Sequence, residues 1–270
     1  MFSSLFYQFP TWIGTVVLSG LQNLGIMTLL GLESFIWGLR SGIKIPNLGR
    51  CLLSVGVQSL PIVSFTALFT GMVLVVQVGN QFMNLGAENI IGGVVGLSLT
   101  REMSPLIVAF VLSARIGSSM AAEIGTMKVT EQIDAMQILG ANPVRELVLP
   151  RILACMIFTP LLVIYSNAVG IFGGYIVAVY QIGVNPELFF QSLTQMVAPH
   201  DFWSGLIKSS GFGFLVAIIG CHKGLQTQGG AKGVGTATTE SVVLMITSIL
   251  VSNYFFSLAF FAWMKWNGYF

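Results

Sequence analysis

The chain has 270 residues, of which 54% are hydrophobic and 8% are charged, and its net charge is +2 at pH 7. A typical soluble domain has about 25% charged residues, so this composition excludes an ordinary soluble enzyme, a disordered chain and a disulfide-rich scaffold. The small net charge also argues against nucleic-acid binding. The mean hydropathy of +0.84 indicates an all-α integral membrane protein with several spans.

Residues 1–50 are expected to form an amphipathic N-terminal region that lies in the membrane interface. Apolar residues from Phe2 to Leu24 recur at the i, i+3, i+4 spacing of one helix face, and the opposite face carries Ser, Thr, Gln and Asn. A transmembrane helix would be apolar all round, so the pattern favours an interfacial helix. A signal peptide is not expected, because no positive charge precedes the apolar run.

Residues 51–270 are expected to form a domain with five transmembrane helices, since a span needs about 20 apolar residues. Lys208 is expected near one end of the fourth span, whereas Arg101 and Glu102 interrupt the second. The predicted spans are 51–87, 89–116, 152–180, 203–222 and 240–264.

The distribution of basic residues predicts the orientation of the chain. With a cytoplasmic N-terminus, nine of the twelve basic residues fall in cytoplasmic segments. Because cytoplasmic segments carry an excess of Lys and Arg, we expect the N-terminus inside and the C-terminus outside. The nine residues are Arg40, Lys44, Arg50, Arg115, Lys128, Arg145, Arg151, Lys223 and Lys232.

The longest cytoplasmic loop, 117–151, is also the most charged part of the chain. In its centre, apolar residues from Ile124 to Ile138 alternate with Glu and Asp, which predicts a short amphipathic helix ended by Gly140 and Pro143. Such a helix either lies on the lipid headgroups or docks into a groove of a cytoplasmic partner.

Arg101 and Glu102 are two adjacent charges inside an apolar span. Each costs roughly 2.5–3.5 kcal/mol on insertion scales unless it is paired or hydrated. Neighbours on a helix point about 100° apart, so each charge needs a partner elsewhere. Two interpretations remain open: a structural ion pair between helices, or residues that line a path for a charged substrate, where Arg suits phosphate and Glu orients an Arg, an amine or water.

Several segments resemble the MlaE family, the permease subunits of lipid ABC transporters. The central motif is AEIGTMKVTEQIDA in the cytoplasmic loop, and the resemblance extends over roughly 55–265, most strongly to the cyanobacterial and plastid branch. The matching segments are 99–105 (LTREMSP), 114–118 (ARIGS), 122–135, 142–143 (NP), 148–151 (VLPR) and 229–239 (GGAKGVGTATT).

The resemblance implies a transport subunit that acts as a homodimer. It implies a cytoplasmic ABC ATPase subunit bound at the loop between spans two and three, an MCE-domain protein on the opposite face, and phospholipid as substrate. This chain would hold no cofactor, because ATP belongs to the partner. The host would be a bacterial inner membrane or, alternatively, the plastid inner envelope. The implied site residues are Arg101 and Glu102 on the lipid path, and Glu123, Gly125, Lys128, Glu131 and Asp134 at the ATPase.

Two other functions compete with this interpretation. An ion-coupled secondary carrier usually has charged or broken helices in both halves, but the sequence suggests no counterpart of the Arg101 and Glu102 pair in span three or four. An intramembrane enzyme could use Glu102 and His222, but no nucleophile–base or metal spacing accompanies them.

The remaining motifs favour structural roles. The Gly-rich segment 224–235 lacks the Walker A lysine and is expected to be a tight turn before span five. Three cysteines, Cys51, Cys155 and Cys221, are expected to be small buried hydrophobes. No metal site is expected at His200 and Asp201, where Asp201 is predicted to cap a helix.

Overall fold

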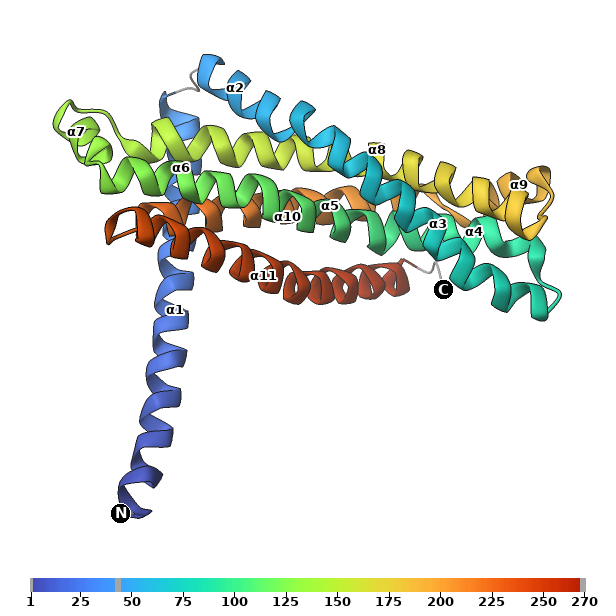
Figure 1. The fold of residues 1–270 in the computed structure, drawn as a ribbon, viewed down its shortest axis with the longest axis horizontal. Coiled ribbons are helices and arrows are strands. Elements are labelled where there is room, and N and C mark those ends of the chain that lie inside the picture. The colour runs from blue at the N-terminus through green and yellow to red at the C-terminus, as the bar shows by residue number, and fades with distance from the viewer. Residues whose placement is uncertain (1, 42–44, 268–270) are drawn as a thin grey trace.

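The structure is a computed structural model that describes residues 2–41 and 45–267, and this part of the chain contains helices and turns but no strand (Figure 1). Most helices run roughly along one direction and form an elongated bundle. The helices are α1 (Phe2–Ser41), α2 (Ile45–Val55), α3 (Leu60–Asn84), α4 (Ile91–Ser98), α5 (Ser104–Leu112), α6 (Ser118–Val129), α7 (Gln132–Ile138), α8 (Leu149–Val177), α9 (Pro186–Met196), α10 (Pro199–Leu225) and α11 (Gly230–Trp266). Six short turns join these helices. Two are 3-10 turns, η1 (Val57–Ser59) and η2 (Glu88–Ile90), and four are π-helical turns, η3 (Leu99–Met103), η4 (Ser113–Gly117), η5 (Val144–Val148) and η6 (Ala178–Ile182).

Five helical stretches are long and apolar enough to cross a membrane, which confirms the predicted number of spans. The π-helical turns do not interrupt them: η3 and η4 join α4, α5 and α6 into one continuous span. The spans are Asn47–Asn84, Glu88–Val129, Val144–Ile182, Pro199–Leu225 and Gly230–Trp266.

The predicted loop 117–151 is much shorter than expected. Span two continues to Val129 and span three begins at Val144, so only 130–143 and the short helix α7 lie between them. The sequence pattern was misleading here because a charged, amphipathic segment can continue an existing helix as well as form a loop. The predicted Gly-rich turn 224–235 is also shorter than expected. Helix α10 ends at Leu225 and α11 begins at Gly230, so only the residues between them form the turn.

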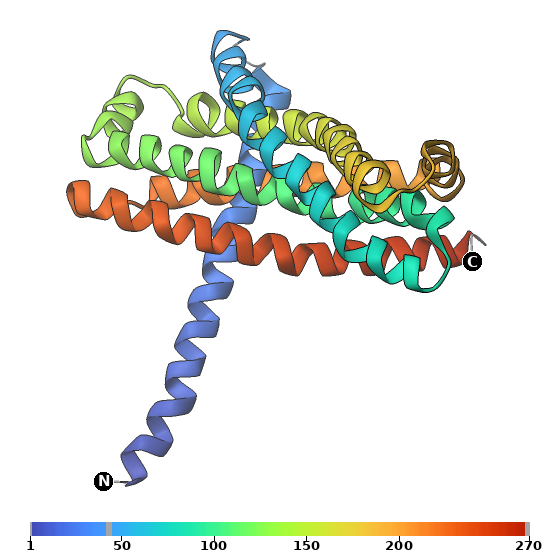
Figure 2. The same cartoon turned by 45° about the vertical axis from the view of Figure 1, so that its right-hand side comes forward.

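The N-terminal helix α1 stands across the bundle in both views (Figures 1 and 2). The predicted boundary at residue 50 falls inside α2. The side chains before Leu18 lie outside the described residues, and with them most of the predicted apolar face. Leu18, Leu21 and Leu24 are exposed on the described part of α1.

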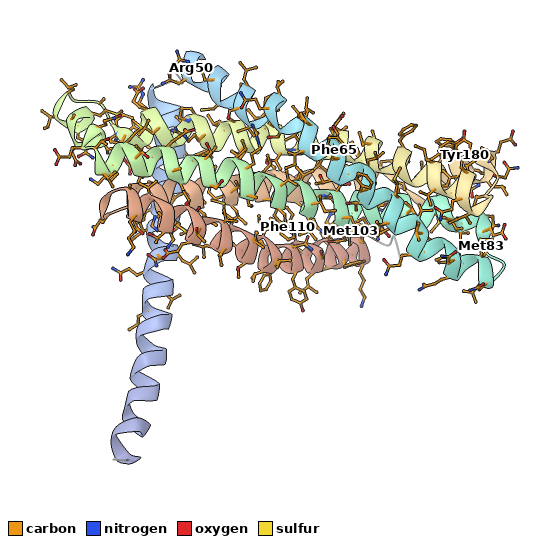
Figure 3. All side chains as sticks on the ribbon, viewed as in Figure 1. Arg50, Phe65, Met83, Met103, Phe110 and Tyr180 are labelled. Atoms are coloured by element: carbon orange, nitrogen blue, oxygen red, sulfur yellow. The ribbon has the colours of Figure 1, made fainter. Side chains whose placement is uncertain are left out.

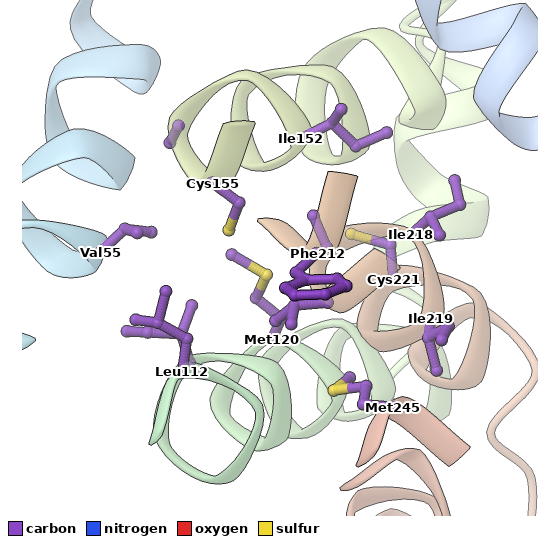
Figure 4. Close-up of a cluster of buried hydrophobic side chains, with 14 of the residues drawn as sticks. Val55, Leu112, Met120, Ile152, Cys155, Phe212, Ile218, Ile219, Cys221 and Met245 are labelled. Carbon is purple, nitrogen blue, oxygen red and sulfur yellow. The ribbon is translucent and has the colours of Figure 1, made fainter. Parts of the chain in front are cut away.

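Helix α3 shows how the apolar spans distinguish inside from outside. Its buried residues recur every four positions at Val63, Ala67, Gly71 and Val75, and its large exposed residues include Phe65 and Phe69 (Figure 3). Both faces are apolar, so the buried face is distinguished by small and β-branched residues rather than by hydrophobicity. The core that this packing creates includes Cys155 and Cys221, as predicted, while Cys51 is only half-buried (Figure 4).

Glycines set the closest helix contacts. A Cβ atom on Gly71 of α3 would overlap the carbonyl oxygen of Gly170 on α8, so these backbones touch. The segment 181–202, between predicted spans three and four, contains the helix α9, which packs in the same way on Gly92 and Gly93 of α4. There the hydroxyl of Ser192 accepts a hydrogen bond from the Gly93 N–H at 3.1 Å.

We expect Gly71→Ala to destabilise the protein by about 1–3 kcal/mol, because the added methyl group forces α3 and α8 apart. The measurement is thermal unfolding of the purified protein in detergent. Gly25→Ala is the matched control, since a Cβ at Gly25 meets nothing within 4 Å. Equal midpoints for both variants would contradict the close contact.

Candidate functional site

The π-helical turn η3 contains Arg101 and Glu102 and is followed by a proline. The Ser104 N–H bonds to the carbonyl of Leu99 rather than to that of Thr100, which defines the turn. A regular α-helix would satisfy the Arg101 carbonyl with the N–H of residue 105, which Pro105 lacks. The backbone therefore presents a free acceptor at the same point of the span where the two charged side chains emerge.

Helix α10 supplies the donor for this carbonyl. The Lys208 ammonium donates to the Arg101 carbonyl oxygen at 3.3 Å. It also donates to Glu102 Oε1 at 2.6 Å and to Ser257 Oγ at 2.8 Å. The Lys208 side chain is only 3% exposed, and these three acceptors match the three hydrogens of its ammonium group.

Glu102 connects spans two and four to span five. Besides Lys208, its carboxylate accepts hydrogen bonds from Asn253 Nδ2 and Ser257 Oγ, both at 3.0 Å and both on α11. Its side chain remains 31% exposed on the surface of the chain. Glu102 is therefore much less enclosed than Lys208, its partner in the ion pair.

Arg101 pairs with the first turn of α10. Its Nε lies 2.6 Å from Asp201 Oδ1, and its guanidinium lies 5.8 Å from the centre of the Phe260 ring. The helix begins earlier than predicted, with Ala198 as its N-cap, so Asp201 is not the cap but lies in the first turn. Its carboxylate accepts the Ala198 N–H at 3.0 Å and so stabilises the helix start in addition to pairing with Arg101. We call Arg101, Glu102, Asp201 and Lys208 the ion-pair cluster; its formal charges sum to zero.

An apolar cavity of about 830 Å³ adjoins the ion-pair cluster between α10 and α11. Its walls are mostly apolar and include four Phe and Trp side chains, with Phe260 and Trp263 stacked on one side and Trp203 lining it from α10. Lys208 and His200 are the polar members of the lining besides Ser204. The cavity thus combines a hydrocarbon-like wall with a neutralised charge, an arrangement suited to an amphiphile.

The sequence predicted that Arg101 and Glu102 each need a separate partner, and the structure confirms this. The expectation that span four carries no counterpart charge is wrong, because Asp201 and Lys208 supply both partners. A signal was present: these two opposite charges lie seven residues apart, and so on one face of α10. A hydropathy analysis does not detect this pair, because a lysine in the first half of an apolar span is usually interpreted as one whose ammonium group reaches the membrane surface.

The predicted coupling residues lie around a break in the helix. Glu131 has a left-handed backbone (φ +59°) between α6 and α7, so Glu123 does not share a helix with Glu131 and Asp134, contrary to the predicted single helix. Glu123 pairs instead with Arg151 of α8, with 2.9 Å between Nη2 and Oε2.

The remaining two coupling candidates close this end of the bundle. Lys128 Nζ lies 2.9 Å from Asp134 Oδ1 and bridges the break between α6 and α7. A Cβ on Gly125 would lie 2.8 Å from the Thr227 hydroxyl in the turn before α11, so α6 approaches that turn closely. Ile138 and Leu139 are 87% and 85% exposed at the tip of α7.

The fold and the ion-pair cluster define a polytopic membrane protein with neutralised charges inside its bundle. The model of the family described as Permease MlaE matches residues 48–259, which includes the ion-pair cluster and the coupling residues. The chain belongs to the MlaE permease family and is a transport subunit of the ABC transporter type.

Curated relatives agree with this assignment. A "Probable ABC transporter permease protein" of Rickettsia prowazekii is 40% identical over 92% of this chain and 96% of its own length. A protein of the same description from Synechocystis is 45% identical over 87% of this chain and 88% of its own length. The chloroplastic protein TRIGALACTOSYLDIACYLGLYCEROL 1 of Arabidopsis thaliana is 37% identical over 83% of this chain and 64% of its own length. The predicted resemblance to cyanobacterial and plastid relatives is confirmed.

We expect Glu102→Gln to destabilise the protein by about 3–5 kcal/mol, because it leaves the buried Lys208 ammonium without its counterion. Lys208→Met should cost less, because the carboxylate it leaves unpaired is 31% exposed. The double variant should recover most of that loss. Thermal unfolding of the four proteins in detergent measures this as a double-mutant cycle. Additive losses would show that the two side chains are not coupled.

Proposed function

We propose that this chain is the membrane subunit of an ATP-driven phospholipid transporter, with a lipid path that runs along the ion-pair cluster. The observation that carries the proposal is the contact between a neutralised charge cluster and an apolar cavity of about 830 Å³. A phospholipid needs both environments, one for its headgroup and one for its chains. The name of the Arabidopsis relative contains that of a galactosylated diacylglycerol, which supports a two-chain glycerolipid as substrate.

The network suggests how a headgroup would act on the bundle. All three hydrogens of the Lys208 ammonium are engaged, so a lipid phosphate binds there only by displacing an acceptor such as Glu102. Glu102 also holds Asn253 and Ser257. Displacing the Glu102 carboxylate would therefore break its bonds to the outer half of α11. The position of the headgroup would in this way be coupled to the position of span five.

The proposal includes a homodimer. Only 11% of the most apolar window of α11 is buried within the chain, the lowest value among the five spans. Large apolar side chains cover its surface, among them Leu250, Tyr254 and Phe255. An apolar surface of this kind is equally stable against lipid and against protein. The polar groups of Glu102 and Asn253 lie beside it, however, and they are more stable against a protein partner than against hydrocarbon. We propose that two copies meet there and enclose the path.

The other partners and the location follow from the same proposal. A cytoplasmic ATPase would bind the α6–α7 end and hold the ATP, so this chain itself would carry no cofactor. An MCE-domain protein would bind the end that carries α9. With α1 across the bundle axis, α1 would lie along the membrane surface as an interfacial helix. A bacterial inner membrane is the proposed location, and the plastid envelope is the alternative suggested by the chloroplastic relative.

The decisive test separates stability from transport. The double variant Glu102→Gln/Lys208→Met should assemble like the wild type. Its lipid transfer between proteoliposomes should nevertheless fall about tenfold or more, because the Lys208 ammonium that would bind the phosphate is gone. The matched control is Lys223→Met/Glu240→Gln, which removes an ion pair of similar length, 2.8 Å, outside the cluster. This control should transfer lipid at the wild-type rate.

If the Glu102→Gln/Lys208→Met variant regains both the stability and the lipid transfer that the single variants lose, the ion-pair cluster is structural and the lipid path lies elsewhere. If the control loses transfer to the same extent, the effect is not specific to the cluster. Co-purification of an ATPase with the wild type tests the transporter class independently of the path.

A further prediction concerns the coupling end. We expect Ile138→Ser and Glu131→Lys each to reduce co-purification of the ATPase several-fold, because exposed aliphatic groups at the tip of α7 suit a groove in a partner. Leu85→Ser is the matched control, since Leu85 is 77% exposed in the turn after α3 at the opposite end of the bundle. Unchanged co-purification of both coupling variants, with normal insertion, would contradict a docking role for α7.

A further inference from the structure

His200 contacts the ion-pair cluster and also lines the apolar cavity of about 830 Å³. It is the second residue of α10 and directly precedes Asp201. Its Nε2 lies 3.4 Å from Asp201 Oδ1, the same oxygen that the Arg101 Nε reaches at 2.6 Å. The His200 side chain is 22% exposed, whereas that of Asp201 is 1% exposed. His200 therefore joins a buried carboxylate to the surface of the cavity.

The charged groups around His200 are those of the ion-pair cluster, on η3 and α10. The α11 side chains beside it are aromatic: the Phe260 ring centre lies 6.4 Å from that of His200, and Trp263 stacks on Phe260. Lys265 of α11 is exposed and does not line the cavity. In the lining that the structure describes, His200 and Lys208 are the ionisable side chains. Histidine is the side-chain type that ordinarily changes its charge between about pH 5 and pH 8.

The charge of His200 sets the net charge that a bound headgroup meets. With a neutral imidazole, the ion-pair cluster and His200 together have no net charge, and with a protonated imidazole they have one positive charge. A phospholipid with one net negative charge balances the protonated state, whereas a zwitterionic phospholipid balances the neutral state. An unbalanced charge is costly beside an apolar cavity. Each protonation state of His200 therefore favours a different headgroup.

We propose that His200 selects the headgroup of the lipid in this cavity. When protonated it favours a phospholipid with a net negative charge, and when neutral it favours a zwitterionic one. The inference rests on the proposed function, because it takes this cavity as part of the lipid path. Protonation of His200 and binding of an anionic lipid favour each other reciprocally. Acidification on the side of the membrane that the start of α10 faces thus shifts the bound lipid from zwitterionic to anionic.

The test uses the full-length protein in nanodiscs that contain equal amounts of phosphatidylglycerol, which is anionic, and phosphatidylcholine, which is zwitterionic. One of the two lipids at a time carries a photoactivatable acyl chain, and peptide mass spectrometry measures the label on the cavity segments 198–208 and 256–263. In the wild type, the ratio of phosphatidylglycerol label to phosphatidylcholine label should rise about tenfold from about pH 8 to about pH 5.5. Both lipids keep their charges over this range, so the change reports on the protein.

Two substitutions separate the charge of His200 from its hydrogen bonding. His200→Gln keeps a hydrogen-bond donor beside Asp201 but does not titrate, so its label ratio should stay at the low value at both pH values. His200→Lys carries a permanent charge and should give the high ratio at both. The matched control is His222→Gln, because His222 is the other histidine of the chain and lies buried near the opposite end of α10. This control should keep the pH dependence of the wild type.

Two outcomes would overturn the proposal: a wild-type ratio that does not change with pH, or a His200→Gln ratio that changes as much as that of the wild type. If His200→Gln does not fold, His200→Lys decides, and a ratio that still follows pH in that variant overturns the proposal. Absence of label from the cavity segments with both lipids would refute the lipid path itself. Labelling at a constant ratio would refute only the role of His200, so the two failures are distinguishable.

Discussion

The need to neutralise charge inside an apolar layer shapes the centre of this molecule. An unpaired ion in such a layer is costly, and the cost falls only when an opposite charge and further hydrogen bonds surround it. Arg101 and Glu102 therefore fix the position of span four, through Asp201 and Lys208, and that of span five, through Asn253 and Ser257. The remaining contacts between the apolar spans depend on close packing at small residues, such as Gly71 against Gly170, because lipid solvates apolar surfaces as well as protein does.

Local irregularities in the helices make this neutralisation possible. The π-helical turn η3 and Pro105 leave a backbone carbonyl free for Lys208. The turn η4 of the same span contains Arg115, whose guanidinium reaches Ser54 and Ser59 at the junction of α2 and α3. Each irregular turn thus directs an arginine toward a neighbouring helix, so the π-helical turns and the arginines they contain stabilise the same helix–helix contacts.

The two proposed functional regions lie on one continuous span. Residues 88–129 form an unbroken helical stretch, with Arg101 and Glu102 of the ion-pair cluster in its first half and Glu123 and Lys128 near its end. At 1.5 Å per residue, about 40 Å separate Glu102 from the break at Glu131. A stiff helix of this length is a direct mechanical connection between a partner at α7 and the contacts of Glu102 with span five.

Much of the fold was determined by the sequence alone. Long apolar stretches fix the number of spans, and the cost of an unpaired charge shows that Arg101 and Glu102 need partners. The sequence did not reveal which partners, because pairing depends on how α10 and α11 are placed around η3, and apolar spans leave that placement open. It also did not reveal the break at Glu131, because amphipathic spacing is the same for one helix and for two. Only the tertiary structure, in which helices approach one another at glycines and buried ions pair with counterions, decided that Lys208 is a buried member of the site.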